Sequence, residues 1–159
     1  MPHIHRRYDF VVSIFIVHRA RVLLCYHKKY REWLPVGGHV DLDEDPEQAL
    51  FKEIREECGL KVRVLAKKPS IAHAGVKPVL TPSYMDVHRI TRAHKHIALI
   101  YFGVSSNARV RLHTREHSQY RWVSAGQLTS RGLALTRSIR FYCRQALRCA
   151  RLSGGGKTA

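Results

Sequence analysis

The most informative part of the chain is GHVDLDEDPEQALFKEIREECGL, residues 38–60. Within it, residues 41–57 hold eight of the chain's 12 acidic residues but only two of its 28 lysines and arginines. The rest of the chain therefore has 26 bases against four acids, and the whole chain has a net charge of +16. Such a segment is either a solvated acidic helix or a divalent-cation site among bases that attract anions.

A helix is expected within this stretch, over residues 46–58. Pro46 suits a first helical turn, Asp45 before it can serve as the N-cap, and Gly59 is the expected C-cap. Three apolar residues four positions apart form a stripe that should pack on a sheet: Leu50, Ile54 and Cys58. The stretch therefore predicts one amphipathic helix with an acidic side.

Three glutamates lie together on that acidic side. Glu53, Glu56 and Glu57 are three and four residues apart, which is the spacing of neighbours on a helix surface. Like charges at this spacing destabilise a helix by roughly 0.2–0.5 kcal/mol per pair. A magnesium or manganese ion would neutralise them, because hard divalent cations take oxygen ligands. The glycines just upstream would let a backbone carbonyl approach the same ion.

This stretch resembles the Nudix box, G-x5-E-x7-R-E-U-x-E-E-x-G-U, in which U is a bulky aliphatic residue. Residues 38–60 match it at every fixed position except one, where Lys52 replaces the usual arginine. The segments Leu34-Pro35 and Tyr120-Arg121-Trp122-Val123 also look like the family. The resemblance therefore extends from the first strands to about residue 130.

The resemblance implies a hydrolase that cleaves a phosphoanhydride bond in a nucleoside diphosphate linked to another group, with Mg²⁺ or Mn²⁺ as cofactor. The metal-binding glutamates of the family map onto Glu53, Glu56 and Glu57, and a carbonyl of Gly37 or Gly38 would be a further ligand. One of these glutamates, or a carboxylate outside the box, would take the proton from the attacking water. The chemistry needs charge neutralisation and in-line positioning more than covalent catalysis.

Other box positions are expected to support the site. By the resemblance, Glu44 fastens the loop to the helix, and Gly59 ends the helix. Lys52 is expected to pair with Glu56 four residues later, as a point charge without the planar fork of arginine. It would then position the glutamates more loosely than arginine does, and the alternative is a plain solvated base.

A carboxylate outside the box is sought among the remaining acids. Glu116 lies six residues before Trp122, in the loop ahead of the last predicted strand. Some family members place an extra metal-binding or proton-accepting glutamate there, so Glu116 is a candidate general base, and an exposed loop acid is the alternative. Asp86 is the second candidate, although a surface strand acid describes it at least as well.

Four residues are weaker candidates for substrate binding. Lys28 and Lys29 form a basic loop that could hold phosphates, and His39 next to the glycine pair could hydrogen-bond a phosphate oxygen. Trp33 could stack on a nucleobase, although an aromatic residue on a strand is more often part of the core. Solvated loops and exposed turns are the alternatives for the other three.

The flanking sequence predicts the rest of an α/β fold. Residues 8–17, 20–27, 61–66, 84–91, 96–104 and 119–123 have the pattern of strands, and residues 133–152 have that of a helix with a basic face. Together with the resemblance, this indicates the Nudix fold, a mixed β-sheet sandwiched between α-helices. We expect one domain over residues 1–152 and a flexible tail over residues 153–159.

Composition narrows the class of protein. With 45% apolar and 25% charged residues, the chain has the composition of a soluble globular protein without a membrane span. Four cysteines lack any zinc or C-x-x-C spacing, which favours reduced thiols and a cytoplasmic location. His94 and His96 have no third ligand at a zinc spacing and are expected to be surface or sheet histidines.

Several activities fit these features. The first is hydrolysis of a nucleoside triphosphate, oxidised or not, to release pyrophosphate. The strongly basic charge of the chain outside the box favours a second activity, removal of pyrophosphate from RNA 5′ ends. Hydrolysis of ADP-ribose or a nucleotide sugar is a further alternative. A non-catalytic Nudix-fold module that binds nucleic acid is the alternative of another class, and a homodimer is compatible with the family.

Overall fold

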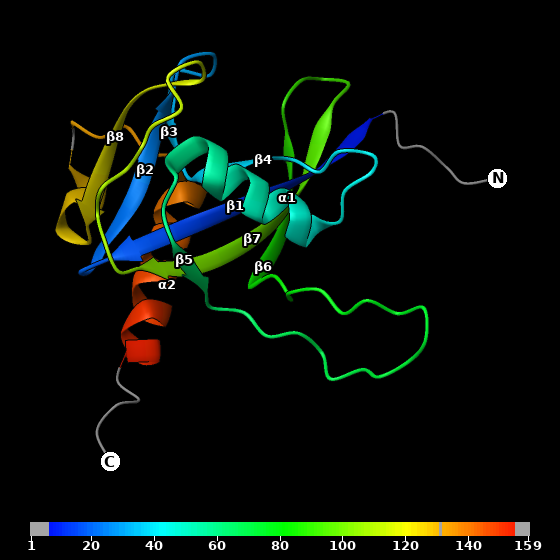
Figure 1. Ribbon diagram of the computed structural model, residues 1–159. Coiled ribbons are helices and arrows are strands. Elements are labelled where there is room, and N and C mark those ends of the chain that lie inside the picture. The colour runs from blue at the N-terminus through cyan, green and yellow to red at the C-terminus, as the bar shows by residue number, and fades with distance from the viewer. Residues whose placement is uncertain (1–6, 131, 155–159) are drawn as a thin grey trace.

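The computed structural model describes residues 7–130 and 132–154 (Figure 1). Its strands are β1 (Tyr8–His18), β2 (Arg21–His27), β3 (Glu32–Leu34), β4 (Val36–His39), β5 (Val62–Val64), β6 (Tyr84–Arg89), β7 (Lys95–Ser105) and β8 (His117–Ser124). Its helices are α1 (Pro46–Glu53), the π-helical turn η1 (Ile54–Cys58), the 3₁₀ turn η2 (Gly126–Thr129) and α2 (Arg137–Gly154). No helix of these described ranges is long and apolar enough to cross a membrane.

The strands form one mixed sheet around the pair β1 and β7. These two strands run parallel over ten register pairs, from Tyr8 opposite Lys95 to Val17 opposite Val104. All the other pairings are antiparallel: β2 and β4 join β1, β5 and β6 join β7, and β3 and β8 join β2. The central strands read as long apolar runs because helices cover both of their faces.

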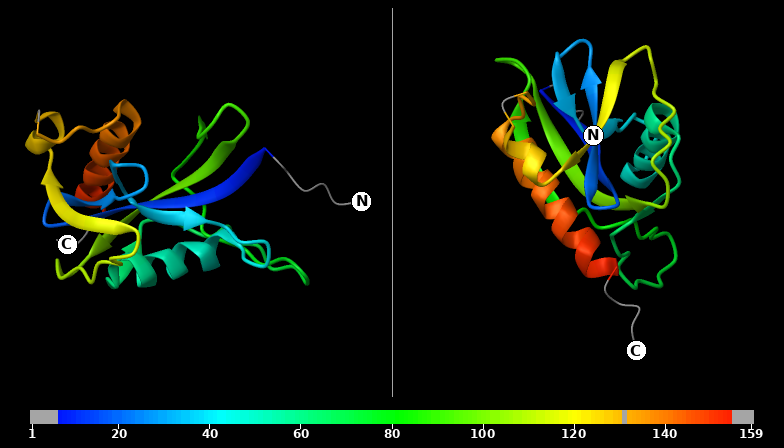
Figure 2. Two further views of the ribbon diagram at one scale, coloured as in Figure 1. Left: turned by 90° about the horizontal axis from the view of Figure 1, so that it is seen from above. Right: turned by 90° about the vertical axis from the view of Figure 1, so that its left-hand side faces the viewer.

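Helices α1 and α2 cover opposite faces of the sheet (Figure 2). The α1 face buries Val12, Ile14 and Leu23 from the sheet against Ala49, Leu50 and Ile54. The α2 face buries Val11, Phe15 and Phe102 against Tyr142, Cys143 and Ala146. Alternate residues of β1 thus serve two cores, as the period of two in a strand requires. The predicted α/β/α arrangement is confirmed.

Three boundaries differ from the sequence prediction. The helix over residues 46–58 is α-helical only to Glu53 and continues as η1 to Cys58. The glycine pair belongs to β4, which is not among the predicted strands, and Gly37 lies there opposite Ser13. Helix α2 begins at Arg137, after the 3₁₀ turn and a short connection, and continues to Gly154. Residues 155–159 of the predicted tail lie outside the described residues.

Candidate active site

The acidic stretch forms one wall of a polar cavity of about 460 Å³ between β4, the end of α1, η1 and the loop before β8. Five carboxylates line this cavity, from residues that span 76 positions of the sequence: Asp41, Glu53, Glu56, Glu57 and Glu116. The other lining residues are Gly37, Gly38, His39, Lys52 and His113. The fold therefore brings together the three box glutamates, the glycine pair and the candidate base predicted outside the box.

The π-helical turn sets the spacing of these glutamates. The Gly59 N–H donates to the Ile54 carbonyl at 2.9 Å, which closes a wider turn than an α-helix, and the Cys58 thiol donates to the same carbonyl at 3.2 Å. Gly59 has φ 62°, in the left-handed region that glycine adopts without strain. Glu53 thus precedes the wide turn, while Glu56 and Glu57 lie within it. Such turns are frequent at functional sites.

Glu57 is the most buried of the carboxylates and has a partner at each oxygen. Its residue is 2% exposed. One oxygen accepts the Gly37 N–H at 2.8 Å, and the other lies 2.6 Å from Nε2 of the buried His117. The other ring nitrogen of His117, Nδ1, has no hydrogen-bond partner among the described residues. These contacts fit a tautomer that carries its hydrogen on Nε2 and donates it to Glu57.

Glu53 lies against the glycine pair. Its carboxylate occupies the space that a side chain at residue 38 would need, so Gly38 is required for this close approach. Burial, followed by the negative charge of Glu57, raises the pKa of Glu53 to about 7. A cation bound nearby would stabilise the ionised form of this carboxyl group and lower its pKa again.

Lys52 makes different contacts from those predicted. Its Nζ donates to Asp41 at 2.8 Å and to Glu44 at 2.7 Å, so it ties the acidic loop to the helix, whereas the predicted pairing with Glu56 is wrong. These two hydrogen bonds raise the pKa of the lysine above its usual range. The predicted role of Glu44 in fastening the loop to the helix agrees with this contact. Glu56 instead has Arg55 as its nearest cation, at 3.6 Å.

The two candidate carboxylates outside the box, Glu116 and Asp86, lie in different parts of the structure. Glu116 lines the cavity, and its backbone carbonyl accepts the Lys28 N–H at 2.9 Å, which holds the loop before β8 against the end of β2. One ligand atom each of Glu57, Glu116 and His117 lie within 4.8 Å of one another. Asp86 instead accepts the Tyr142 hydroxyl at 2.6 Å on the α2 face of the sheet. Asp86 is therefore not part of this cavity.

The four candidate substrate residues lie in different places. His39 lines the cavity. The Lys28 amine donates to the carbonyl of Thr114, and Lys29 lies beside the Tyr30 ring; neither lysine lines the cavity. Trp33 is 7% exposed and packs in the α2-face core, with Arg121 over its ring. The placement of Trp33 follows the core alternative, and stacking on a base finds no support.

Sequence reasoning did not identify His117. It follows Glu116 directly but has no spacing to the box that marks it. Its contact with Glu57 spans 60 residues and arises because β8 pairs with β2, where His117 lies opposite His27. Only the sheet pairing could reveal that a histidine supports the last glutamate of the box.

The donors in this cavity fit a hard divalent cation. Carboxylates of Glu53, Glu56 and Glu116 supply oxygen atoms, which are the ligands that Mg²⁺ and Mn²⁺ prefer. The one lysine that lines the cavity, Lys52, is already paired with loop carboxylates. The other carboxylates of the cavity therefore have no lysine among the described residues to neutralise them, and a bound cation would do so.

Comparisons with known proteins agree with this geometry. The NUDIX domain family profile matches residues 7–145. An RNA pyrophosphohydrolase of Acidiphilium cryptum (strain JF-5) is 29% identical over 112 residues, which cover 69% of this chain and 67% of that protein. A CTP pyrophosphohydrolase of Escherichia coli (strain K12) is 29% identical over 98 residues, which cover 57% of this chain and 73% of that protein.

A solved structure shares the fold over nearly the whole length. The crystal structure of a NUDIX family hydrolase from Clostridium perfringens superposes with a TM-score of 0.76 and 28% identity, covering 91% of this chain and 97% of that one. The family match spans the whole sheet, helix α1, the first half of α2 and every carboxylate of the cavity. The chain therefore belongs to the NUDIX domain family and is a Nudix pyrophosphohydrolase.

Proposed function

We propose that the protein hydrolyses nucleoside triphosphates, oxidised or not, to a nucleoside monophosphate and pyrophosphate, with Mg²⁺ or Mn²⁺ as cofactor. The observation that supports this is the convergence of five carboxylates on one polar cavity whose only lysine is already paired. Such a cavity binds a triphosphate only through a cation, because carboxylates repel phosphate oxygens.

Glu53, Glu56 and Glu57 would hold the ion, with the backbone carbonyl of Gly37 or Gly38 nearby. When bound, the ion neutralises the phosphate oxygens and lowers the pKa of a coordinated water. Lys52 keeps the acidic loop against the helix and so fixes the opening of the cavity. Its role is to position Glu44 and Asp41, not to touch phosphate.

Glu116 is the proposed general base. It lies in the loop before β8 and is exposed, so a water molecule can reach it and its proton can leave to solvent. Glu57 is held by Gly37 and His117 in one orientation and supplies a fixed negative charge beside Glu53. We assign Glu57 to the catalytic set because of this preorganisation.

A substrate panel tests the assignment. Nucleoside triphosphates are incubated with the protein in Mg²⁺ and in Mn²⁺, and pyrophosphate release is measured for the wild type and for Glu53→Gln, Glu57→Gln and Glu116→Gln. We expect each variant to lose at least about 100-fold in kcat, since general bases and charged ligands contribute at this level. Asp43→Asn is the matched control, because Asp43 is an exposed acid of the same loop outside the cavity. Full activity in Glu57→Gln would refute its role.

RNA 5′ ends are the second candidate substrate. The chain carries a net charge of +16, and the relative from Acidiphilium cryptum is an RNA pyrophosphohydrolase. A 5′-triphosphorylated oligonucleotide would be compared with free nucleoside triphosphates across a salt series. If the basic surface binds RNA, kcat/KM for RNA falls steeply with salt while that for nucleotides changes little. Parallel salt curves for both substrates would exclude an RNA-specific role.

A further inference from the structure

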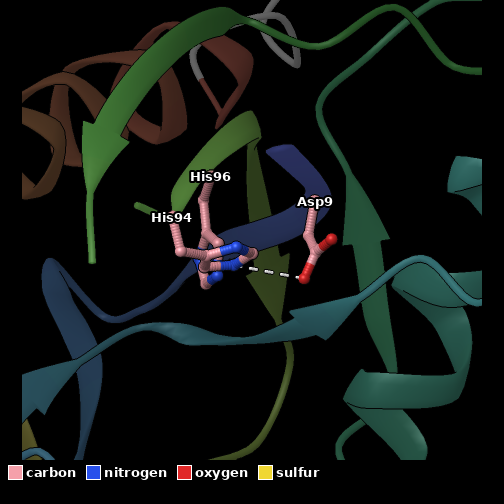
Figure 3. Close-up of side chains that lie close together, drawn as sticks. All are labelled: Asp9, His94 and His96. Atoms are coloured by element: carbon pink, nitrogen blue, oxygen red, sulfur yellow. Dashed lines mark ion pairs between the residues drawn. The ribbon is translucent and has the colours of Figure 1, made fainter. Parts of the chain in front are cut away.

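A second group of metal-ligating side chains lies outside the candidate active site. His94 Nε2 is 3.2 Å from Asp9 Oδ2, and one ligand atom each of Asp9, His94 and His96 lie within 4.8 Å of one another. Figure 3 shows the two imidazoles side by side with their nitrogens near the Asp9 carboxylate. We propose that these three residues bind a transition-metal ion, with Zn²⁺ as the expected occupant.

The sheet topology creates this group. Asp9 lies opposite His96 in the parallel pairing of β1 with β7, so both side chains project from one face. That face is the α2 face, because Val11 and Ala98, two residues further along each strand, belong to its core. His94 lies two residues before His96 and reaches the same face from the β6–β7 connection. The third ligand that the sequence spacing lacked therefore comes from a strand 85 residues away.

The backbone that carries the ligands is already ordered. The carbonyl of His94 accepts the N–H groups of Ile90 and Thr91 at 3.0 and 3.1 Å, which closes the turn. The Lys95 N–H donates to the Arg7 carbonyl at 2.9 Å and ties that turn to the start of β1. A metal site gains affinity when its ligands need little reorganisation. An ion here would join three ligands whose backbones are held in place.

The chemistry of the donors selects the class of metal. Two imidazoles and one carboxylate suit Zn²⁺ and its neighbours, whereas Mg²⁺ prefers a set of oxygen ligands. Further imidazoles surround the group: the ring centroids of His39 and His88 lie 4.9 and 5.4 Å from that of His96.

Exposure leaves room for an ion to enter. The side chains of His94 and Asp9 are 28% and 46% exposed, while His96 is buried at the base of the group. Three protein ligands with one open position are a common arrangement for zinc, with water as the fourth ligand. The 3.2 Å between His94 and Asp9 is close to the ligand separation of about 3.3 Å that tetrahedral bonds of about 2.05 Å require.

Calorimetric titration of the metal-free full chain with Zn²⁺, in millimolar Mg²⁺ that fills the carboxylate cavity, tests the proposal. We expect one equivalent of Zn²⁺ to bind the wild type and this equivalent to be lost in His94→Ala and in Asp9→Asn. His73→Ala, at an exposed loop histidine, should bind as the wild type does. At a 100-fold excess over Kd, Zn²⁺ should raise the Tm of the wild type by roughly 5–10 °C and leave that of His94→Ala unchanged.

The double variant Glu53→Gln/Glu56→Gln separates this site from the carboxylate cavity. It should retain the zinc equivalent, and Co²⁺ bound to it should give the visible absorption of a tetrahedral nitrogen–oxygen site. No zinc binding by the wild type would overturn the proposal. Equal binding by His94→Ala, or loss of the equivalent in the double variant, would overturn it as well. These outcomes do not depend on hydrolytic activity.

Discussion

At the scale of the residue, the adjacent glycines Gly37 and Gly38 are required for different reasons. A methyl group at Gly37 would overlap the backbone carbonyl of Val12 on the neighbouring strand, which cannot move without breaking the sheet. A methyl group at Gly38 would meet the carboxylate of Glu53, the free end of a flexible side chain. The first glycine therefore serves the fold, and the second serves the site.

These contacts predict different effects for two alanine substitutions. Gly37→Ala should lower the free energy of unfolding by about 1–3 kcal/mol, because overpacking displaces backbone. Gly38→Ala should change the free energy of unfolding by less than about 1 kcal/mol. It should displace Glu53 and so reduce the rate of Mg²⁺-dependent hydrolysis at least about tenfold, because a misplaced catalytic group lowers the rate. Urea unfolding and pyrophosphate release measure the two effects. Equal activity of the wild type and Gly38→Ala would contradict the assigned contact.

His117 contacts Glu57 directly, so we expect it to act on the chemistry through that carboxylate. His117→Leu removes the donor to the buried carboxylate and should lower kcat by roughly 10–100-fold, the usual effect of losing a partner of a metal-site ligand. His117→Gln retains an N–H donor and should recover part of this loss. The same leucine substitution in a Glu57→Gln background should have little additional effect, as kinetic measurement of the double-mutant cycle would show. Additive losses would mean that His117 acts by another route.

At the scale of the element, the helix of the Nudix box has a complete N-terminal cap. Asp45 Oδ1 accepts the N–H groups of Glu47 and Gln48 at 2.8 and 2.9 Å, and the Gln48 side chain accepts the Asp45 N–H at 2.9 Å. A hydrogen bond from Lys77, followed by that from the Gln48 N–H, lowers the pKa of Asp45. The cap also anchors the irregular segment before β6, since Lys77 reaches it from that segment.

The cap gives a matched pair of substitutions. Asp45→Ala should reduce the free energy of unfolding by about 1 kcal/mol, the typical cost of an N-cap aspartate. Asp43→Ala, an exposed acid two residues earlier, should change it by less than about 0.5 kcal/mol. Chemical denaturation at pH 7 compares the two. If both variants unfold at the same denaturant concentration, the capping hydrogen bonds contribute nothing.

At the scale of the whole molecule, the two helices that cover the sheet also protect its thiols. Cys25 and Cys58 lie in the α1-face core and Cys143 lies in the α2-face core, while Cys149 is partly exposed on α2. Burial raises the pKa of Cys58 to about 11 and that of Cys143 to about 12, and that of Cys25 still further. The protonated thiol is the unreactive form.

Thiol labelling at pH 8 should therefore modify one cysteine of the folded chain rapidly and all four only after unfolding. The rapid site should be Cys149, and Cys149→Ser should abolish the fast phase. Rapid labelling of Cys58 in the native protein would contradict the packing of η1.

The buried thiols also predict a pH dependence of stability. Because the thiols ionise near pH 9 in the unfolded chain and at higher pH in the folded one, the free energy of unfolding should fall as pH rises from about 9 toward 12.

Local spacing accounts for what could be predicted without the structure. The helix of the box, its cap, its apolar stripe and its acidic side depend on residues within 13 positions of one another, and all of them were found. Six strands were found because each carries its own apolar run, whereas β4, which contains the glycine pair, was not predicted. The π-helical turn was missed, since it arises from the way Gly59 and Cys58 share one carbonyl at the packed end of the helix.

Local patterns were enough to identify the family, the fold class and the box carboxylates, because a helix places neighbours by a fixed period. The distant groups that meet these carboxylates became visible only in the folded molecule. The Glu57–His117 contact and the Asp9–His94–His96 group both depend on strand pairings that join residues more than 50 positions apart. Pairing register follows from the burial of two whole sheet faces, a property of the packed molecule that no short spacing records.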